Sequence, residues 1–169
     1  MSNRSFFLQR ESLIGTDRLV LFCDNRVVVK DDNFIWQHKH VIDLLQEKLE
    51  KDGVTTDIIR GDVSANNRTR IFDEFQNTPD PQVLIIQPQA AAHGVTLTAA
   101  NTIVWWGPTS SLETYAQANA RVHRSGQTHP CTVVQLQGSP VEKAVYRMLD
   151  NRINVHTKMI DLYEEVLES

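Results

Sequence analysis

Apolar residues are arranged in two different patterns along this chain. Short runs rich in apolar residues predict β-strands at 19–23, 54–59, 83–86, 102–106 and 132–136. Elsewhere the apolar residues recur every three or four positions, as in the stretch from His40 to Gly53, where they are Val41, Leu44, Leu45 and Leu49. Such stretches predict amphipathic helices, and a glycine such as Gly53 ends them. Because strands alternate with helices, we expect parallel crossover units and hence an α/β fold.

Capping residues indicate where several helices begin. Ser64 precedes a stretch whose apolar face would be Ile71, Phe72 and Phe75. Ser110 followed by Glu113 is a capping-box pattern, so a helix is expected directly after Ser110. Ser139 followed by Pro140 predicts the start of a further helix, because proline is tolerated in the first helical turn.

The two ends of the chain differ in pattern from its middle. Residues 1–17 show no clear period and are interpreted as an N-terminal extension or a linker remnant, whereas 18–150 would form the folded domain. Helix-forming residues continue through 151–169, which we expect to be a C-terminal bracing helix. A further strand is predicted at 27–29, joined to the first strand by a turn at 24–26.

Composition places the chain among ordinary soluble globular proteins. Hydrophobic residues make up 41% and charged residues 22%, and no apolar run is long enough to cross a bilayer. No membrane partner is therefore expected. The net charge of −4 argues against a free-standing, non-specific nucleic-acid binder. Cys23 and Cys131 lack metal-ligand spacing and are interpreted as free thiols in a reducing compartment, so no metal site is predicted and a cytoplasmic location is expected.

The most informative segment for chemistry is 117–127, Gln-Ala-Asn-Ala-Arg-Val-His-Arg-Ser-Gly-Gln. On a helix of about 3.6 residues per turn, Gln117, Arg121 and Arg124 would lie within an arc of roughly 60°. Guanidinium groups held on one rigid face suit a phosphate, whose oxygens they bind in pairs. The alternative is a solvated basic helix end, which the helix dipole favours in any case.

This segment resembles motif VI of the Swi/Snf-type DNA translocases, within superfamily two of the helicase-like ATPases. The family reads roughly Gln-Ala-x-x-Arg-x-x-Arg-x-Gly-Gln, and 117–127 carries every fixed residue of it. The preceding residues extend the likeness, since the Ser-Leu-Glu-Thr-Tyr-Ala-Gln-Ala-Asn-Ala-Arg run at 111–121 resembles bacteriophage and prophage members. The resemblance implies a RecA-like three-layer α/β sandwich with a mostly parallel central sheet, in a bacterial or phage-infected cell.

A loop at 91–101 resembles motif V of the same family. His93 and Gly94 match the family pattern, whereas Ala92 replaces a usual glycine and Thr96 replaces a usual asparagine. The resemblance implies that Gly94 contacts the nucleotide and that His93 and Thr96 contact the DNA backbone. The lost glycine indicates weakened coupling between ATP and DNA. The alternative is a connecting loop whose small residues serve packing.

A third segment, Arg60-Gly61-Asp62-Val63-Ser64 with Arg68, resembles a family turn that lies near bound DNA. The resemblance implies DNA contacts from Gly61, Ser64 and Arg68. Gly61 is expected to adopt a backbone conformation that a side chain would strain. The alternative is a plain turn with a salt-bridging arginine.

The chain lacks two features of a complete ATPase of this class: the Gly-x-x-x-x-Gly-Lys-Ser/Thr phosphate loop and the acidic magnesium motif. It therefore resembles a second lobe alone, a fragment or a split subunit, and ATP and Mg²⁺ would bind only with a separate first lobe. In that arrangement Arg124 would be the arginine finger, Arg121 would contact the same phosphate, and Gln117 would orient both or contact the nucleotide.

This hypothesis predicts a half-site for ATP hydrolysis coupled to movement along double-stranded DNA. It requires that both guanidinium groups are free of internal ion pairs and face the crevice at the carboxyl ends of the strands. Two alternatives stay open: an inactive interaction or regulatory module derived from such a lobe, and an unrelated nucleotide-binding α/β enzyme.

Overall fold

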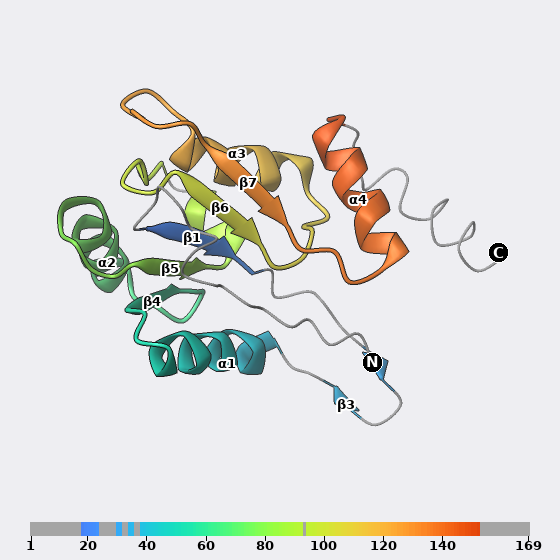
Figure 1. Cartoon of the computed structure of the whole chain (residues 1–169), viewed down its shortest axis with the longest axis horizontal. Helices are drawn as coiled ribbons and strands as arrows, with labels where there is room; N and C mark the ends of the chain where they lie inside the picture. The colour runs from blue at the N-terminus through green and yellow to red at the C-terminus, as the bar shows by residue number, and fades with distance from the viewer. Residues whose placement is uncertain (1–17, 24–29, 32–33, 36–37, 93, 153–169) are drawn as a thin grey trace, which may run out of the picture.

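A computed structural model describes residues 18–23, 30–31, 34–35, 38–92 and 94–152 of the chain (Figure 1). Its centre is a five-stranded parallel sheet in the order β4-β5-β1-β6-β7. The strands are β1 (Leu19–Phe22), β4 (Thr56–Ile59), β5 (Val83–Ile86), β6 (Thr102–Trp105) and β7 (Thr132–Gln135). A separate antiparallel pair is formed by β2 (Lys30–Asp31) and β3 (Phe34–Ile35).

Helices cover both faces of the sheet, so the molecule has three layers (Figure 1). The helices are α1 (His38–Lys51), α2 (Ala65–Asn77), the 3₁₀ helix η2 (Pro88–Ala92), α3 (Leu112–Val122) and α4 (Pro140–Asp150). Side chains of α1 pack on one face, while those of α2, η2, α3 and α4 pack on the other. This arrangement confirms the predicted three-layer α/β sandwich.

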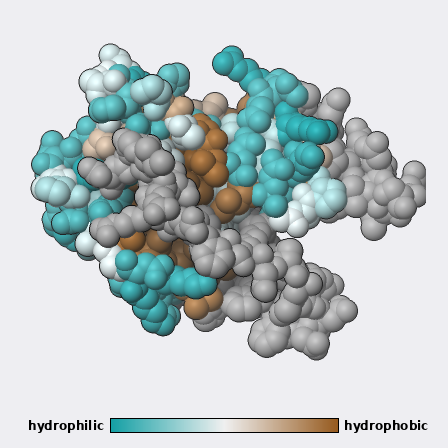
Figure 2. Space-filling model, in the orientation of Figure 1, coloured by the Kyte–Doolittle hydropathy of each residue, from teal (hydrophilic) through white to brown (hydrophobic). Residues whose placement is uncertain are grey.

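The strands divide their side chains between two cores because successive residues of a strand point to opposite faces. In β1, Val20 and Phe22 join the core under α2, α3 and α4, while Leu19 and Leu21 join the core under α1. The central strands β1 and β5 are buried at every position, as expected when helices cover both faces. Figure 2 shows apolar surface gathered toward the middle of the molecule, with hydrophilic residues around it.

One predicted detail of side-chain burial, that of Leu44, is wrong, and the predicted strand at 132–136 is present but partly exposed. Leu44 is 49% exposed, because α1 turns the face formed by Ile42, Leu45 and Leu49 toward the sheet. Strand β7 is the last strand of the sheet, and its Val133 and Val134 are 42% and 38% exposed. The apolar pattern identified both elements but not their position in the fold.

The helix caps agree with the sequence at two of three starts. Ser64 accepts a hydrogen bond from the amide of Asn67, and Ser139 accepts one from the amide of Glu142. The third prediction is wrong by one residue: Ser111, not Ser110, caps α3, accepting from the Thr114 amide at 3.1 Å. The helix begins at Leu112, so Ser111 is the residue directly before it and its hydroxyl reaches an amide that has no partner within the helix.

Several predicted segments lie outside the described residues: the strand at 27–29, its turn at 24–26, the extension at 1–17 and most of the C-terminal segment, 153–169. Helix α4 ends at Asp150, with Asn151 as its C-cap. Among the helices of the described chain, none combines the length and the apolarity that crossing a membrane demands.

Replacing Ser139 with alanine is expected to lower the free energy of unfolding by about 1 kcal/mol. Its hydroxyl caps the Glu142 amide, while the Glu142 carboxylate accepts from the amide of Gly138, the residue before the cap, so both groups stabilise the start of α4. Urea denaturation measures the change, with Ser125→Ala at an exposed loop position as the control. Equal stability of the two variants would contradict a role for this cap.

Candidate functional site

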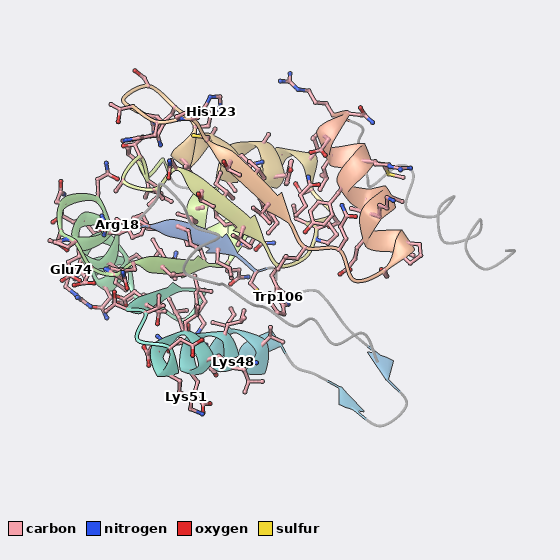
Figure 3. The ribbon with its side chains drawn as sticks, viewed as in Figure 1. Arg18, Lys48, Lys51, Glu74, Trp106 and His123 are labelled. Carbon is pink, nitrogen blue, oxygen red and sulfur yellow. The ribbon has the colours of Figure 1, made fainter. Side chains whose placement is uncertain are left out.

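The topology decides at which edge of the sheet the arginine segment lies. Helix α3 begins after the end of β6 and carries the chain back to the start of β7. Its last turn therefore lies at the amino edge, the edge at which the parallel strands begin. Figure 3 shows this directly: His123, the C-cap of α3, and Trp106, which follows β6, lie at opposite edges. The expectation that the arginines face the carboxyl-end crevice is therefore wrong.

Arg124 also lies beyond the helix on which it was predicted. Helix α3 ends at Val122, and the backbone amide of its cap, His123, donates to the Asn119 carbonyl at 3.0 Å. Gly126 adopts φ of +97°, a left-handed conformation that favours glycine. The predicted arc holds for Gln117 and Arg121, which are one helical turn apart, but Arg124 projects from the turn that follows.

The Arg121 side chain contacts the end of η2 and the Arg124 side chain contacts the loop that follows it, so the structure brings the motif VI and motif V segments together. The Nε atom of Arg121 donates to the Ala91 carbonyl at 3.0 Å. An Nη atom of Arg124 donates to the Val95 carbonyl at 3.3 Å. The Leu97 amide in turn donates to the Arg121 carbonyl at 2.9 Å. The loop is thereby fastened to the end of α3 by side chains and by backbone.

Gly94 lies between the two carbonyls that the arginines contact. Its φ is +77°, and a Cβ atom added there would meet nothing within 4 Å. Glycine is therefore favoured by backbone conformation and not by lack of space. The open space leaves this loop accessible, and Thr96 is exposed beside it. His93, the remaining candidate of the loop, lies outside the described residues.

Gln117 has a partner within its own helix. Its Nε2 donates to the Glu113 carboxylate at 2.9 Å, one turn earlier on α3. Gln117 and Arg121 are four residues apart and so share a helix face. Gln117 therefore lies nearer to the start of α3 than either arginine.

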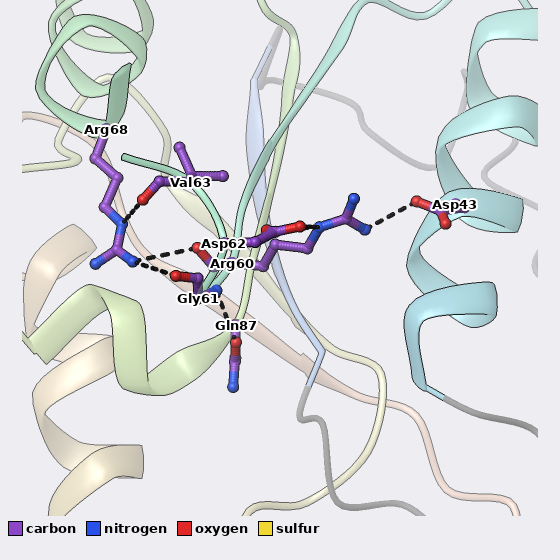
Figure 4. A network of polar contacts seen from close by, with 7 residues as sticks. All are labelled: Asp43, Arg60, Gly61, Asp62, Val63, Arg68 and Gln87. Carbon is purple, nitrogen blue, oxygen red and sulfur yellow. Dashed lines mark hydrogen bonds and ion pairs between the residues drawn. The ribbon is translucent and has the colours of Figure 1, made fainter. Parts of the chain in front are cut away.

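The third candidate segment lies at the opposite, carboxyl edge, directly after β4 (Figure 4). The Arg68 guanidinium donates to three carbonyls of this turn: Val63 at 2.9 Å, Gly61 at 3.2 Å and Arg60 at 3.3 Å. Arg68 thus holds the turn together from the first part of α2. The side chain of Ser64 caps α2 and is exposed.

The backbone conformation predicted for Gly61 is wrong. Its φ is not positive, and an added Cβ would meet only the Gln87 side chain, at 3.9 Å. A side chain would therefore not strain this turn. Its amide instead donates to the Gln87 side-chain oxygen at 3.2 Å, which ties the turn to the end of β5.

Arg60 is the ion-paired arginine of this turn. It contacts Asp62 and Asp43, each at 2.9 Å (Figure 4). Although partial burial opposes it, hydrogen bonding and the charges of these carboxylates raise the pKa of Arg60 above its usual value. Arg124 differs from Arg60, because its side chain is exposed and forms no ion pair within the described part of the chain.

Two glutamines that the sequence did not single out as site residues also hold the motif V loop. Gln76, near the end of α2, contacts Thr98 and Ala99, and Gln127 contacts Thr98 and Ala100. Gln127 is a fixed residue of the motif VI pattern, which was the available signal. For Gln76 no local pattern pointed to the loop, because its partners are more than 20 residues away.

A five-stranded parallel sheet in the order β4-β5-β1-β6-β7, with helices on both faces, defines a RecA-like α/β lobe. The family model for the helicase conserved C-terminal domain matches residues 13–126. The chain therefore belongs to the helicase C-terminal domain family.

Similar proteins agree with this assignment. The bifunctional helicase and thymine dioxygenase JBP2 of Leishmania braziliensis is 36% identical over 115 residues, which cover 66% of this chain and 10% of that protein. The chromodomain-helicase-DNA-binding protein 1-like of Danio rerio is 29% identical over 126 residues, covering 74% of this chain and 12% of that protein. The chain thus spans about a tenth of the length of these relatives.

Solved structures show the same fold. The C-terminal part of the Fun30 ATPase domain superposes with a TM-score of 0.64 at 21% identity, covering 78% of this chain and 38% of that one. The C-terminal domain of the DEAD-box protein Dbp5 also gives a TM-score of 0.64, at 16% identity, covering 85% of this chain and 73% of that one. At these identities the likeness concerns the fold alone.

Proposed function

We propose that this chain is the second lobe of an ATP-dependent double-stranded-DNA translocase of Swi/Snf type, of the lineage found in phages and prophages. In this proposal the chain supplies the motif V loop and an arginine finger to an ATP site. A first RecA-like lobe, in the same polypeptide or in a second one, supplies the phosphate loop and the Mg²⁺ ligands.

The observation that carries the proposal is the state of Arg124. Its guanidinium is exposed, lies beside the open loop at Gly94, and has a neutral carbonyl as its hydrogen-bond partner. A bond between two charged groups is shorter and stronger than one to a neutral acceptor. A phosphate brought to this edge would therefore displace the Val95 carbonyl without breaking an ion pair.

The position of Arg124 sets the direction from which the nucleotide arrives. The proposal gives up the requirement of a carboxyl-end crevice, because a finger needs only a phosphate presented beside its guanidinium. Since the arginines lie at the amino edge, the first lobe would present ATP and Mg²⁺ there. Arg124 would then place positive charge on the γ-phosphoryl group as negative charge develops in the transition state. Arg121, fastened to the Ala91 carbonyl, would approach the same phosphates, with Gly94 allowing the backbone to come close.

For DNA, the proposal assigns backbone contacts to exposed groups at both edges. Thr96 is exposed on the motif V loop, and Gly61 and Ser64 are exposed on the turn that Arg68 holds. The proposal also includes His93, which lies outside the described residues. Short polar groups and backbone amides of this kind contact phosphates without reading sequence. Relatives described as a helicase and as a DNA-binding protein support nucleic acid as the substrate.

The test is to combine the chain with its matching first lobe and to measure ATP hydrolysis with and without linear duplex DNA. We expect hydrolysis that requires both lobes, increases with DNA and weakens as salt is raised, because phosphate contacts release counterions. The absence of hydrolysis from a mixture of two folded lobes that bind each other would contradict the proposal and favour an interaction module.

A further inference from the structure

Gln127 lies where three parts of the proposed nucleotide edge meet. Its Nε2 carries two N–H groups and lies within donating distance of three carbonyls, Ala100 at 2.8 Å, Val122 at 3.2 Å and Thr98 at 3.4 Å, so two of them share one hydrogen. Its Oε1 accepts from the His129 amide at 3.1 Å. One half-buried amide group thus joins the end of the motif V loop, the last residue of α3 and the turn that follows Arg124.

The same loop segment is held from the other side by α2. The Nε2 of Gln76 donates to the Thr98 hydroxyl at 2.8 Å, and its Oε1 accepts from the Ala99 amide at 3.1 Å. Residues 98–100 therefore lie between two amide side chains from different parts of the chain. This leaves the loop little freedom to move relative to α3 without breaking hydrogen bonds of Gln127.

Arg124 lies between Val122 and Gln127, in a turn that hydrogen bonds of Gln127 hold together. The backbone amide of Gln127 donates to the Arg124 carbonyl at 3.1 Å, and its side chain fixes the Val122 carbonyl two residues before Arg124. The arginine side chain then reaches the Val95 carbonyl of the loop that Gln127 also holds. Both the backbone of Arg124 and its partner are thus positioned by one side chain.

We propose that Gln127 is a positioning residue that sets the place of the Arg124 guanidinium relative to the motif V loop, and that it acts on catalysis only through Arg124. The inference rests on the proposed finger role of Arg124. Gln127 itself contacts backbone groups and not the reacting phosphate. Small displacements of a catalytic group lower rates strongly, by about 100-fold for roughly 1 Å.

Two variants of Gln127 test the role of its side-chain amide. Gln127→Ala removes the hydrogen bonds, and Gln127→Glu turns a carboxylate, which accepts only, toward three carbonyls. Gln46→Glu is the matched control, because it makes the same change of charge on α1, on the opposite face of the sheet. In the isolated chain, hydrogen exchange of the Leu97 amide, which bonds to the Arg121 carbonyl, should be faster in both Gln127 variants and unchanged in the control.

The deciding experiment is a double-mutant cycle on the two-lobe ATPase. We expect Gln127→Ala to lower kcat by about 10- to 100-fold with little change in KM for ATP. In an Arg124→Ala background, Gln127→Ala should lower kcat no further, because a residue acting through Arg124 has nothing left to position. A purely structural role would instead reduce both backgrounds by the same factor.

The outcomes separate this inference from the proposed function. A multiplicative loss, or a normal kcat for Gln127→Ala beside an impaired Arg124→Ala, would overturn the positioning role and leave the finger role standing. An unimpaired Arg124→Ala enzyme would overturn the finger role and this inference with it. Melting transitions of each variant show whether a lost kcat reflects lost folding.

Discussion

Replacing Arg124 with alanine is expected to lower kcat of the two-lobe ATPase by at least about 10³-fold. The guanidinium would meet the γ-phosphoryl group when its charge is greatest, so its loss falls on the transition state and less on ATP binding. KM for ATP should therefore change much less than kcat. Steady-state ATP hydrolysis with saturating duplex DNA measures both constants.

Two further variants make this result specific. Arg147→Ala removes an arginine that is exposed on α4, away from the loop, and should leave kcat within about twofold of the parent. Arg124→Lys keeps the charge but loses the planar fork of donors, so we expect only partial activity. Equal kcat values for Arg124→Ala and Arg147→Ala would contradict the finger role.

Replacing Trp105 with alanine is expected to lower the free energy of unfolding by about 3–5 kcal/mol. Trp105 is fully buried at the end of β6, with its ring centroid 4.8 Å from that of Phe22 and 4.9 Å from that of Tyr115. Its indole N–H donates to the Asn119 side chain of α3 at 2.9 Å. Truncation would leave a cavity under α3 and an amide oxygen without its donor.

Urea denaturation of the isolated chain measures this loss. The neighbouring residue offers a control, since Trp106 is half-buried and packs against the core on the other face of the sheet. Trp106→Ala should therefore lower stability by clearly less than Trp105→Ala. A loss below about 1 kcal/mol for Trp105→Ala would contradict its place as a central core residue.

Most of the architecture could be predicted from the sequence because its strands and helix starts depend on local residue patterns. A fully apolar run such as Val83–Ile86 is typical of a buried parallel strand, and the structure buries all of it. Ser64 and Ser139 identified helix starts because capping depends on neighbouring residues alone. Where two serines adjoin, the pattern could not distinguish Ser110 from Ser111.

The candidate site was predicted less completely, since its geometry depends on distant contacts. Extending helical periodicity through Arg124 was wrong because α3 ends at Val122, where the His123 cap and Gly126 turn the chain. The edge of the sheet at which the arginines lie follows from the crossover between β6 and β7, which residue spacing alone does not reveal. The hydrogen bonds of Gln76 likewise join segments far apart in the chain.

The most direct test is a structure of the chain bound to its first lobe, Mg²⁺ and a non-hydrolysable ATP analogue. The account predicts the nucleotide at the amino edge of the sheet, with the Arg124 guanidinium about 3 Å from a γ-phosphate oxygen in place of the Val95 carbonyl. A nucleotide bound at the carboxyl edge beside Ser64, with Arg124 still on Val95, would contradict it.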